Sequence, residues 1–207
     1  MAALKQFQSN DDKANEEFFC NTHSREDSGA YVVRLPFKPG LDLDFPGSLA
    51  RAKQVLLRLE KKFDINSSFA ELYYDFMRDY ANQDRMRLDY SGNMQSSSHC
   101  FFFPHHGVFK TNCPTPKIRI VFNGSAKSNN YILLNDVLYF EENLLRGSSD
   151  ILFSWMKYMF VFVSDIKDMF RCIKVHLNNQ KYQCILWRFN PQEPIFVCYC
   201  RLLPTIW

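Results

Sequence analysis

The spacing of the apolar residues constrains this fold most, because between residues 49 and 80 it follows the period of a helix. Apolar residues recur there every three or four positions in two successive stripes, which predicts two amphipathic helices. Ser68 and Glu71 have capping-box spacing at the start of the second helix. The stripes consist of Leu49, Ala52, Leu56, Leu59 and Phe63 in the first helix, and of Phe69, Leu72, Tyr73, Phe76, Met77 and Tyr80 in the second.

Later in the chain the apolar period shortens to that of a strand. At residues 117–122, side chains alternate between two faces, with Lys117, Arg119 and Val121 on one and Ile118, Ile120 and Phe122 on the other. A helix is expected at about 149–158, and the order of elements indicates an α+β fold. The strand at 196–203 has no later segment to cover its edge, so the domain is expected to be cut short. Further strands are predicted at 31–37, 100–103, 159–164, 173–177, 182–189 and 196–203.

Composition and charge exclude some classes of protein. The chain has 207 residues, including 20 Phe and 10 Tyr, and so aromatic a chain is not expected to be disordered. A net charge of +3 permits nucleic-acid binding without indicating it. The seven cysteines are an odd, scattered set, and the polar N-terminus carries no secretory signal. The apolar stretches are too short to cross a bilayer, so we expect a cytoplasmic protein with no membrane partner.

The segment 160–171 carries the clearest chemical signal. Asp165 stands at the end of an apolar run that is expected to be a strand, and Asp168 and Phe170 follow in what is expected to be a tight turn. A carboxylate at a strand end is a suitable ligand for Mg²⁺, which takes one or two protein oxygens beside substrate phosphates. Asp165 could equally cap the following turn, and spacing alone leaves both possibilities open. Zinc is not expected, because pairs such as Cys20 and His23 do not combine into regularly spaced ligand couples.

Four sequence blocks occur together in one order. The chain resembles, over about residues 30–203, the N-terminal part of the reverse transcriptase of BEL/Pao-type LTR retrotransposon polyproteins. The blocks are 31–38 (YVVRLPFK), 103–108 (FPHHGV), 117–127 (KIRIVFNGSAK) with 134–136 (LND) after it, and 164–171 (SDIKDMFR) followed by 182–188 (YQCILWR).

The resemblance implies the fingers and partial palm of a right-handed polymerase. Residues 1–28 would be a polar tether, 29–158 the fingers-like region, and 159–207 a truncated palm. Asp165 would be the first catalytic aspartate and would bind Mg²⁺ for phosphoryl transfer. Arg119 would grip the triphosphate, and Phe170 would be a steric gate against a 2′-hydroxyl. The resemblance also implies triphosphate contacts from Lys110, as a weaker candidate, and from the backbone around Ile166, Asp168 and Met169.

The chain departs from the family at several positions. Asn123 stands where the family usually has Asp, and Phe170 where it usually has Tyr. The sequence holds no Tyr-x-Asp-Asp motif, the source of the other catalytic aspartates. The expected function is therefore a fragment of an RNA-directed DNA polymerase that is inactive alone. The alternative is a domesticated nucleic-acid-binding module.

The resemblance also implies partners and a location. RNA or DNA template-primer and deoxynucleotide triphosphates are the expected partners. Besides the cytoplasm, a virus-like particle or the nucleus is a possible location. The histidines His105 and His106 are expected in loop packing or template contact. The oligomeric state is left open.

Overall fold

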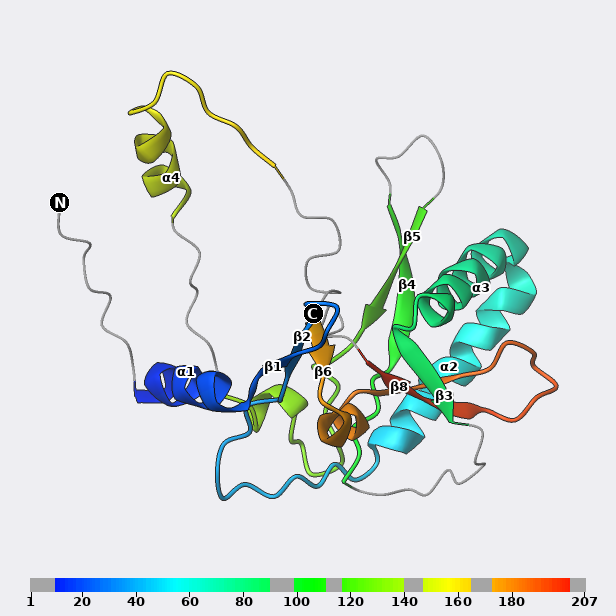
Figure 1. The fold of residues 1–207 in the computed structure, drawn as a ribbon. Helices are drawn as coiled ribbons and strands as arrows, with labels where there is room; N and C mark the ends of the chain where they lie inside the picture. Colours follow the sequence, from blue (N-terminus) through cyan, green and yellow to red (C-terminus); the bar gives the residue numbers. More distant parts are fainter. Residues whose placement is uncertain (1–9, 90–98, 111–116, 140–146, 165–172, 202–207) are drawn as a thin grey trace.

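The computed structural model describes residues 10–89, 99–110, 117–139, 147–164 and 173–201 (Figure 1). The chain combines helices with small sheets, so the expected α+β class is confirmed. The helices are α1 (Asn10–Thr22), α2 (Ser48–Ile65), α3 (Ser67–Asn82) and α4 (Ser148–Trp155), with 3₁₀ turns η1 (Leu134–Asp136) and η3 (Leu177–Tyr182). The strands are β1 (Ser24–Arg25), β2 (Tyr31–Val33), β3 (Met86–Asp89), β4 (His105–Lys110), β5 (Lys117–Phe122), β6 (Ile173–Val175), β7 (Cys184–Trp187) and β8 (Phe196–Cys200).

Helices α2 and α3 confirm the two amphipathic helices, but their junction differs from the prediction. Asn66 ends α2, where its backbone N–H donates to Lys62, and also caps α3, where its side-chain oxygen accepts from the Phe69 N–H at 2.9 Å. The capping box expected at Ser68 and Glu71 is therefore wrong, because the N-cap of α3 is Asn66, two residues before Ser68, and its side chain accepts from the Phe69 N–H. The buried stripes are Ala52, Leu56, Leu59 and Phe63 on α2, and Phe69, Tyr73, Met77 and Tyr80 on α3.

A three-stranded antiparallel sheet with the order β3-β8-β7 meets these helices. Trp187 of β7 lies in the core, where its ring stacks on Tyr73 at 5.5 Å and meets Phe63 edge-on at 6.4 Å. Strand β8 is central in the sheet, so the open edge expected at 196–203 is wrong for the described residues 196–201. Strand β7 directly precedes β8 in the chain, whereas β3 lies far earlier, so sequence order alone does not reveal the partner on that side.

The aromatic segment 101–103 runs beside β7 without becoming a regular strand. Phe101 and Phe103 are fully buried; the Cys184 N–H donates to the Phe101 carbonyl at 3.0 Å, and the Phe103 N–H donates to the Cys184 carbonyl at 2.8 Å. Only an isolated bridge, between Phe102 and Cys184, is formed. The strand predicted at 100–103 is therefore reduced to one bridge that covers the outer side of β7.

The described residues of the N-terminal region form a helix and a short strand. Residues 10–22 form α1, which has no buried residue, and β1 pairs with β2. Strand β2 in turn pairs in parallel with β6, so residues far apart in sequence form a second three-stranded sheet, β1-β2-β6. Ser24 and Arg25 are thus joined to β2, and the tether expected at 1–28 stays a prediction.

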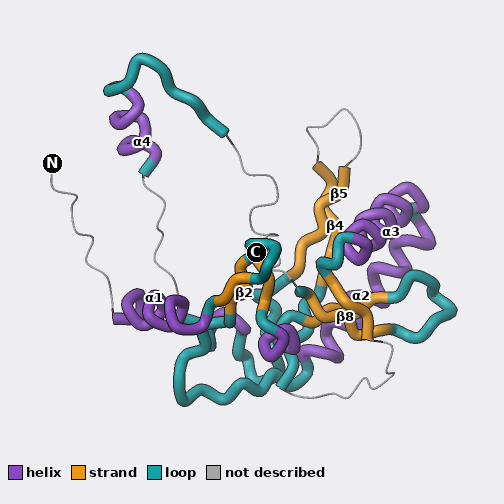
Figure 2. The backbone as a smooth tube through the Cα atoms, in the orientation of Figure 1, coloured by secondary structure: helices purple, strands orange, loops and turns teal. Residues whose placement is uncertain are grey.

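Helix α4 and the residues after it form no strand. The helix covers most of the predicted 149–158 but has no buried residue. Figure 2 shows α4 and the coil that follows it standing apart from the sheets. The strand predicted at 159–164 is wrong, because among the described residues none pairs with it, and an unpaired strand leaves its backbone groups unsatisfied. Phe160 and Phe162 are 76% and 91% exposed.

No helix in the described part of the chain is both long and apolar enough to cross a membrane.

Candidate nucleotide-binding face

The hairpin of β4 and β5 presents two different faces. On β5, Ile120 and Phe122 are buried, and the Phe122 ring lies 5.7 Å from that of Tyr80 on α3. Lys117 and Arg119 occupy the alternate positions and are exposed. Because successive side chains of a strand point to opposite faces, packing against α3 holds the basic residues toward solvent. The strand predicted at 117–122, and the orientation predicted for Arg119, are confirmed.

The register of the hairpin decides which residues accompany Arg119. Arg119 lies opposite Val108, and Lys117 lies opposite Lys110 at the end of the ladder. His106, which is exposed, lies opposite Val121. The backbone positions of Arg119 and Lys110 are therefore close along one hairpin, as a shared triphosphate site requires.

Gly107 lets the hairpin approach α3 closely. A Cβ at this position would lie 2.5 Å from Cδ1 of Ile118 and 3.1 Å from Cζ of Phe69. The Phe69 ring also lies 5.4 Å from Phe109, so β4 packs against the start of α3 on both sides of Gly107. The glycine in the FPHHGV block thus serves packing of the hairpin onto the helix.

His105, the first residue of β4, is buried on the inner face of the hairpin, and both of its ring nitrogens have a hydrogen-bond partner. Its Nε2 lies 3.0 Å from the carbonyl oxygen of Leu186, and its Nδ1 lies 2.5 Å from the hydroxyl of Tyr73. A carbonyl oxygen can only accept, so Nε2–H donates to Leu186 and Nδ1 accepts from the Tyr73 hydroxyl. Burial lowers the pKa of His105 to about 4, with a smaller lowering from nearby His106 and an opposing effect of the Leu186 hydrogen bond.

This network joins three elements that are far apart in sequence, α3, β4 and β7. Of the two roles expected for the histidine pair, packing is the one His105 fills. His106 faces solvent on the other side of the strand. The sequence did not predict these partners. Tyr73 belongs to the apolar stripe of a helix, and Leu186 contributes only its backbone carbonyl, which any residue has.

Asn123 forms a local turn at the end of β5. Its Oδ1 accepts from the Ser125 N–H at 3.0 Å, and its own N–H donates to the Pro104 carbonyl at 2.8 Å. An aspartate oxygen could accept the same bond, so either residue type would support this turn.

The remaining predicted site residues lie outside the described residues. These are Asp165, Ile166, Asp168, Met169 and Phe170, together with the side chain of Lys110. Within the described ranges, no three His, Cys, Asp or Glu side chains are grouped so that they could hold a metal ion. The Mg²⁺ site and the steric gate therefore stay predictions.

No protein-family model matches the sequence, and no curated protein matches it with significant similarity.

Proposed function

We propose that this chain contributes the fingers and the first part of the palm of an RNA-directed DNA polymerase, and that the exposed face of β4 and β5 binds the triphosphate of a nucleotide. The supporting observation is the two-sided hairpin. Its inner face is fixed on α3, while Arg119 and Lys117 are held toward solvent.

A rigid support matters for this role because a triphosphate site needs its cations in place before the ligand arrives. An Arg guanidinium can bind phosphate oxygens through two parallel hydrogen bonds, which a Lys ammonium cannot. The buried side chains of Ile120 and Phe122, which follow Arg119 on the opposite face of β5, hold the strand in this orientation. Arg119 is therefore the main phosphate ligand in this proposal, and Lys117 and Lys110 add charge.

The sequence resemblance supplies the catalytic part of the proposal. Asp165 would hold Mg²⁺, whose charge would offset that of the reacting phosphates. A lone carboxylate is a weak ligand, so nucleotide binding in this chain would depend mainly on Arg119. Phe170 would discriminate against ribonucleotides without affecting phosphate contacts.

The test is a titration of the 207-residue chain with a deoxynucleotide triphosphate, with and without Mg²⁺. Loss of a charge-assisted contact worth roughly 1.5–3 kcal/mol should raise Kd about tenfold or more in Arg119→Gln. Arg119→Lys should recover only part of the affinity, because Lys restores the positive charge but not the two parallel N–H donors of the guanidinium. Arg78→Gln is the matched control, since Arg78 is exposed on α3 and pairs only with its neighbour Asp75 in an exposed ion pair. Equal affinities of Arg119→Gln and Arg78→Gln would contradict the proposed site.

A stand-alone nucleic-acid-binding module would use the same hairpin face, but the exposed apolar segment that begins in α4 and continues after it favours the polymerase. Residues 152–163 expose Phe153, Phe160 and Phe162 to 66%, 76% and 91%. Contiguous exposed apolar surface marks a region that another part of an assembly covers. A module that functions alone has no reason to keep it.

A further inference from the structure

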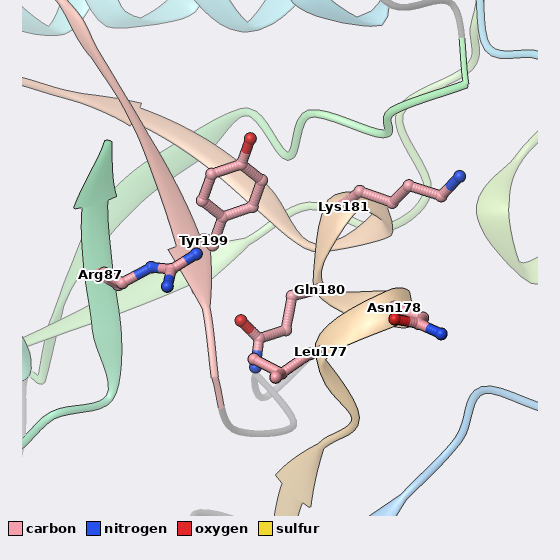
Figure 3. A pocket seen from close by; sticks show the side chains of 6 residues that line it. All are labelled: Arg87, Leu177, Asn178, Gln180, Lys181 and Tyr199. Carbon is pink, nitrogen blue, oxygen red and sulfur yellow. The ribbon is translucent and has the colours of Figure 1, made fainter. Parts of the chain in front are cut away.

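The polar groups around one cavity of the described chain do not converge on a ligand. The cavity, of about 310 Å³, opens between β3, β8 and the 3₁₀ turn η3 (Figure 3). Arg87 and Tyr199 lie opposite each other on neighbouring strands and form one wall. The Lys181 ammonium and the Asn178 amide are turned away from them, and Lys181 Nζ lies over the ring of Tyr182 at 5.0 Å. These donors cannot reach one ligand together, so the cavity is not a candidate site.

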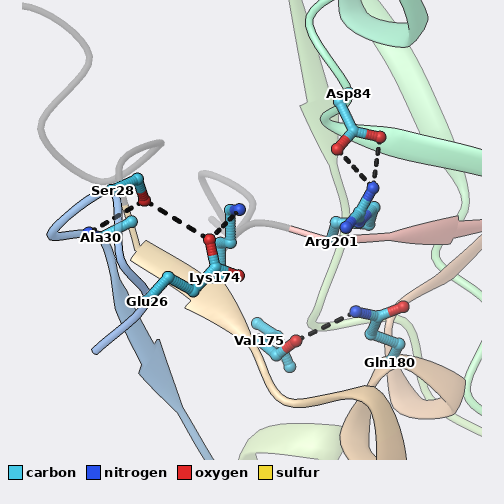
Figure 4. Close-up of polar contacts among 8 residues, drawn as sticks. All are labelled: Glu26, Ser28, Ala30, Asp84, Lys174, Val175, Gln180 and Arg201. Carbon is cyan, nitrogen blue, oxygen red and sulfur yellow. Dashed lines mark hydrogen bonds and ion pairs between the residues drawn. The ribbon is translucent and has the colours of Figure 1, made fainter. Parts of the chain in front are cut away.

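The charged side chains around β6 are already paired. Lys174 forms an ion pair with Glu26, and Arg201 donates to both carboxylate oxygens of Asp84 (Figure 4). A charge that turned to a ligand would leave its partner without a hydrogen bond, so neither pair presents a free group.

Asn123 and Gly124, directly after β5, offer a different kind of chemistry. They are the only Asn-Gly pair in the sequence. In such a pair the main-chain nitrogen of the glycine can attack the side-chain carbonyl carbon of the asparagine and close a five-membered ring. Glycine permits this attack more readily than other residues do, because it has no side chain in the way and adopts a wide range of backbone angles. The sequence marks the position, and the structure decides whether the amide is held for attack.

The Asn123 side chain is held across the turn. Its Oδ1 accepts from the Ser125 N–H at 3.0 Å, so the amide spans the intervening residue, Gly124. The same bond polarises the amide carbonyl, because a donor stabilises the negative charge that the oxygen gains when a nucleophile adds to Cγ. The Asn123 N–H donates to the Pro104 carbonyl at 2.8 Å. Both the backbone and the side chain of Asn123 are therefore fixed, and its Cγ is the electrophile.

The Gly124 nitrogen is the nucleophile. Among the described residues none accepts a hydrogen bond from its N–H, whereas the N–H groups of Asn123 and Ser125 on either side are both bonded. The nitrogen must lose this proton before it attacks, and no hydrogen bond within the described chain has to break first. Gly124 is buried, so hydroxide reaches the N–H less readily than in an unfolded chain. The reaction is therefore expected to be slower in the folded chain than in the unfolded one.

We propose that Asn123 is a site of spontaneous deamidation. The Gly124 nitrogen gives its proton to hydroxide and bonds to Cγ of Asn123, and the Cγ–Nδ2 bond breaks as Nδ2 takes a proton from water and leaves as ammonia. Water then opens the imide ring. Cleavage at Cγ yields aspartate, and cleavage at the main-chain carbonyl carbon yields isoaspartate, whose main chain runs through Cβ and Cγ. One water is consumed and one ammonia is released, with no oxidation or reduction.

Asn66 serves as an internal comparison in the same chain. Its side-chain oxygen also accepts a backbone hydrogen bond, from the Phe69 N–H at 2.9 Å. The residue that follows it is Ser67, the first residue of α3, whose side chain obstructs the attack. Asn66 should therefore stay intact while Asn123 converts.

The experiment incubates the 207-residue chain at neutral and at mildly alkaline pH, and follows each asparagine by peptide mass spectrometry after digestion in acid. We expect a gain of one mass unit at Asn123 before any other asparagine, with isoaspartate and aspartate both present, at a rate that rises with pH. Gly124→Ala should slow this conversion several-fold, because its methyl group obstructs the attacking nitrogen. Ser125→Ala is the matched control and should leave the rate unchanged, since Asn123 Oδ1 is bonded to the Ser125 backbone and not to its side chain.

The outcomes that would overturn the proposal are distinct. Aspartate without isoaspartate would show direct hydrolysis of the side-chain amide instead of attack by the Gly124 nitrogen. Equal conversion of Asn66 and Asn123, or an unchanged mass at Asn123, would show that the turn does not present the pair for reaction. An unchanged rate in Gly124→Ala would rule out the open approach of the Gly124 nitrogen as the cause. Loss of folding would free the pair and speed the reaction, so slowing in Gly124→Ala cannot come from unfolding. The reaction uses neither Arg119 nor Asp165, so its test is independent of the polymerase function.

Discussion

Acid should destabilise this protein through one residue, His105. Its imidazole is buried and neutral, with Nε2–H donating to Leu186 and Nδ1 accepting from Tyr73. Protonation would place a second donor against the Tyr73 hydroxyl and a charge in the core. Burial lowers the pKa of His105 from 6.5 to about 4 in the folded state. The unfolded chain therefore binds the proton more readily than the folded chain does.

The sign and size of the effect follow from this difference. Between about pH 6.5 and pH 4 the unfolded state holds more protons at this site, so the free energy of unfolding falls as the pH falls. The difference between the pKa of His105 in the unfolded chain and in the folded chain corresponds to roughly 3 kcal/mol of stability, at about 1.4 kcal/mol for each pKa unit. The stabilisation is complete above pH 6.5 and is lost by about pH 4. A loss of this size is a large part of the stability of an ordinary domain.

The assay is urea unfolding followed by Trp fluorescence at intervals between pH 7.5 and pH 4. Trp187 reports on this region directly, because its ring lies 5.9 Å from that of His105. A His105→Gln variant should be less stable at neutral pH but should lose most of the pH dependence. His106→Gln is the matched control, since His106 is the next residue and is exposed. If His105→Gln and the unsubstituted chain show the same slope against pH, the neutral buried imidazole is not the cause.

Three further substitutions test other parts of the fold. Gly107→Ala should destabilise by about 1–3 kcal/mol in urea unfolding, because its Cβ would overlap Ile118; Gly147→Ala, where the nearest atom is 3.3 Å away, should be close to neutral. Glu60→Gln should cost about 1–3 kcal/mol, because Arg188 donates to both Glu60 oxygens at 2.7 Å in a largely buried pair; Asp75→Asn, in an exposed pair, should cost under about 1 kcal/mol. Phe162→Asp should leave the free energy of unfolding unchanged in urea unfolding, since Phe162 is 91% exposed. A loss of more than about 1 kcal/mol would show that this side chain is packed against the folded chain.

The sequence by itself determined the elements whose pattern is local. Helices α2 and α3 follow from apolar stripes that repeat within one element, and the two faces of β5 follow from strict alternation. The exposed Arg119 was predictable for the same reason. Each of these features depends on neighbours within about four residues, and that information is present in the sequence alone.

The tertiary structure decided which strands meet. The parallel pairing of β2 with β6 joins residues separated by more than 140 positions, and β8 became central only because β3 and β7 flank it. The strand predicted at 159–164 has a strong local pattern but no neighbour among the described residues. A strand is stabilised by hydrogen bonds to a second strand, and a local pattern cannot supply one.

The same limit applies to the candidate sites. His105 gave no sign in the sequence of its neutral, buried state, which depends on Tyr73 from α3 and Leu186 from β7. Hydrogen bonding and desolvation depend on distances in space, and only the folded chain sets those distances.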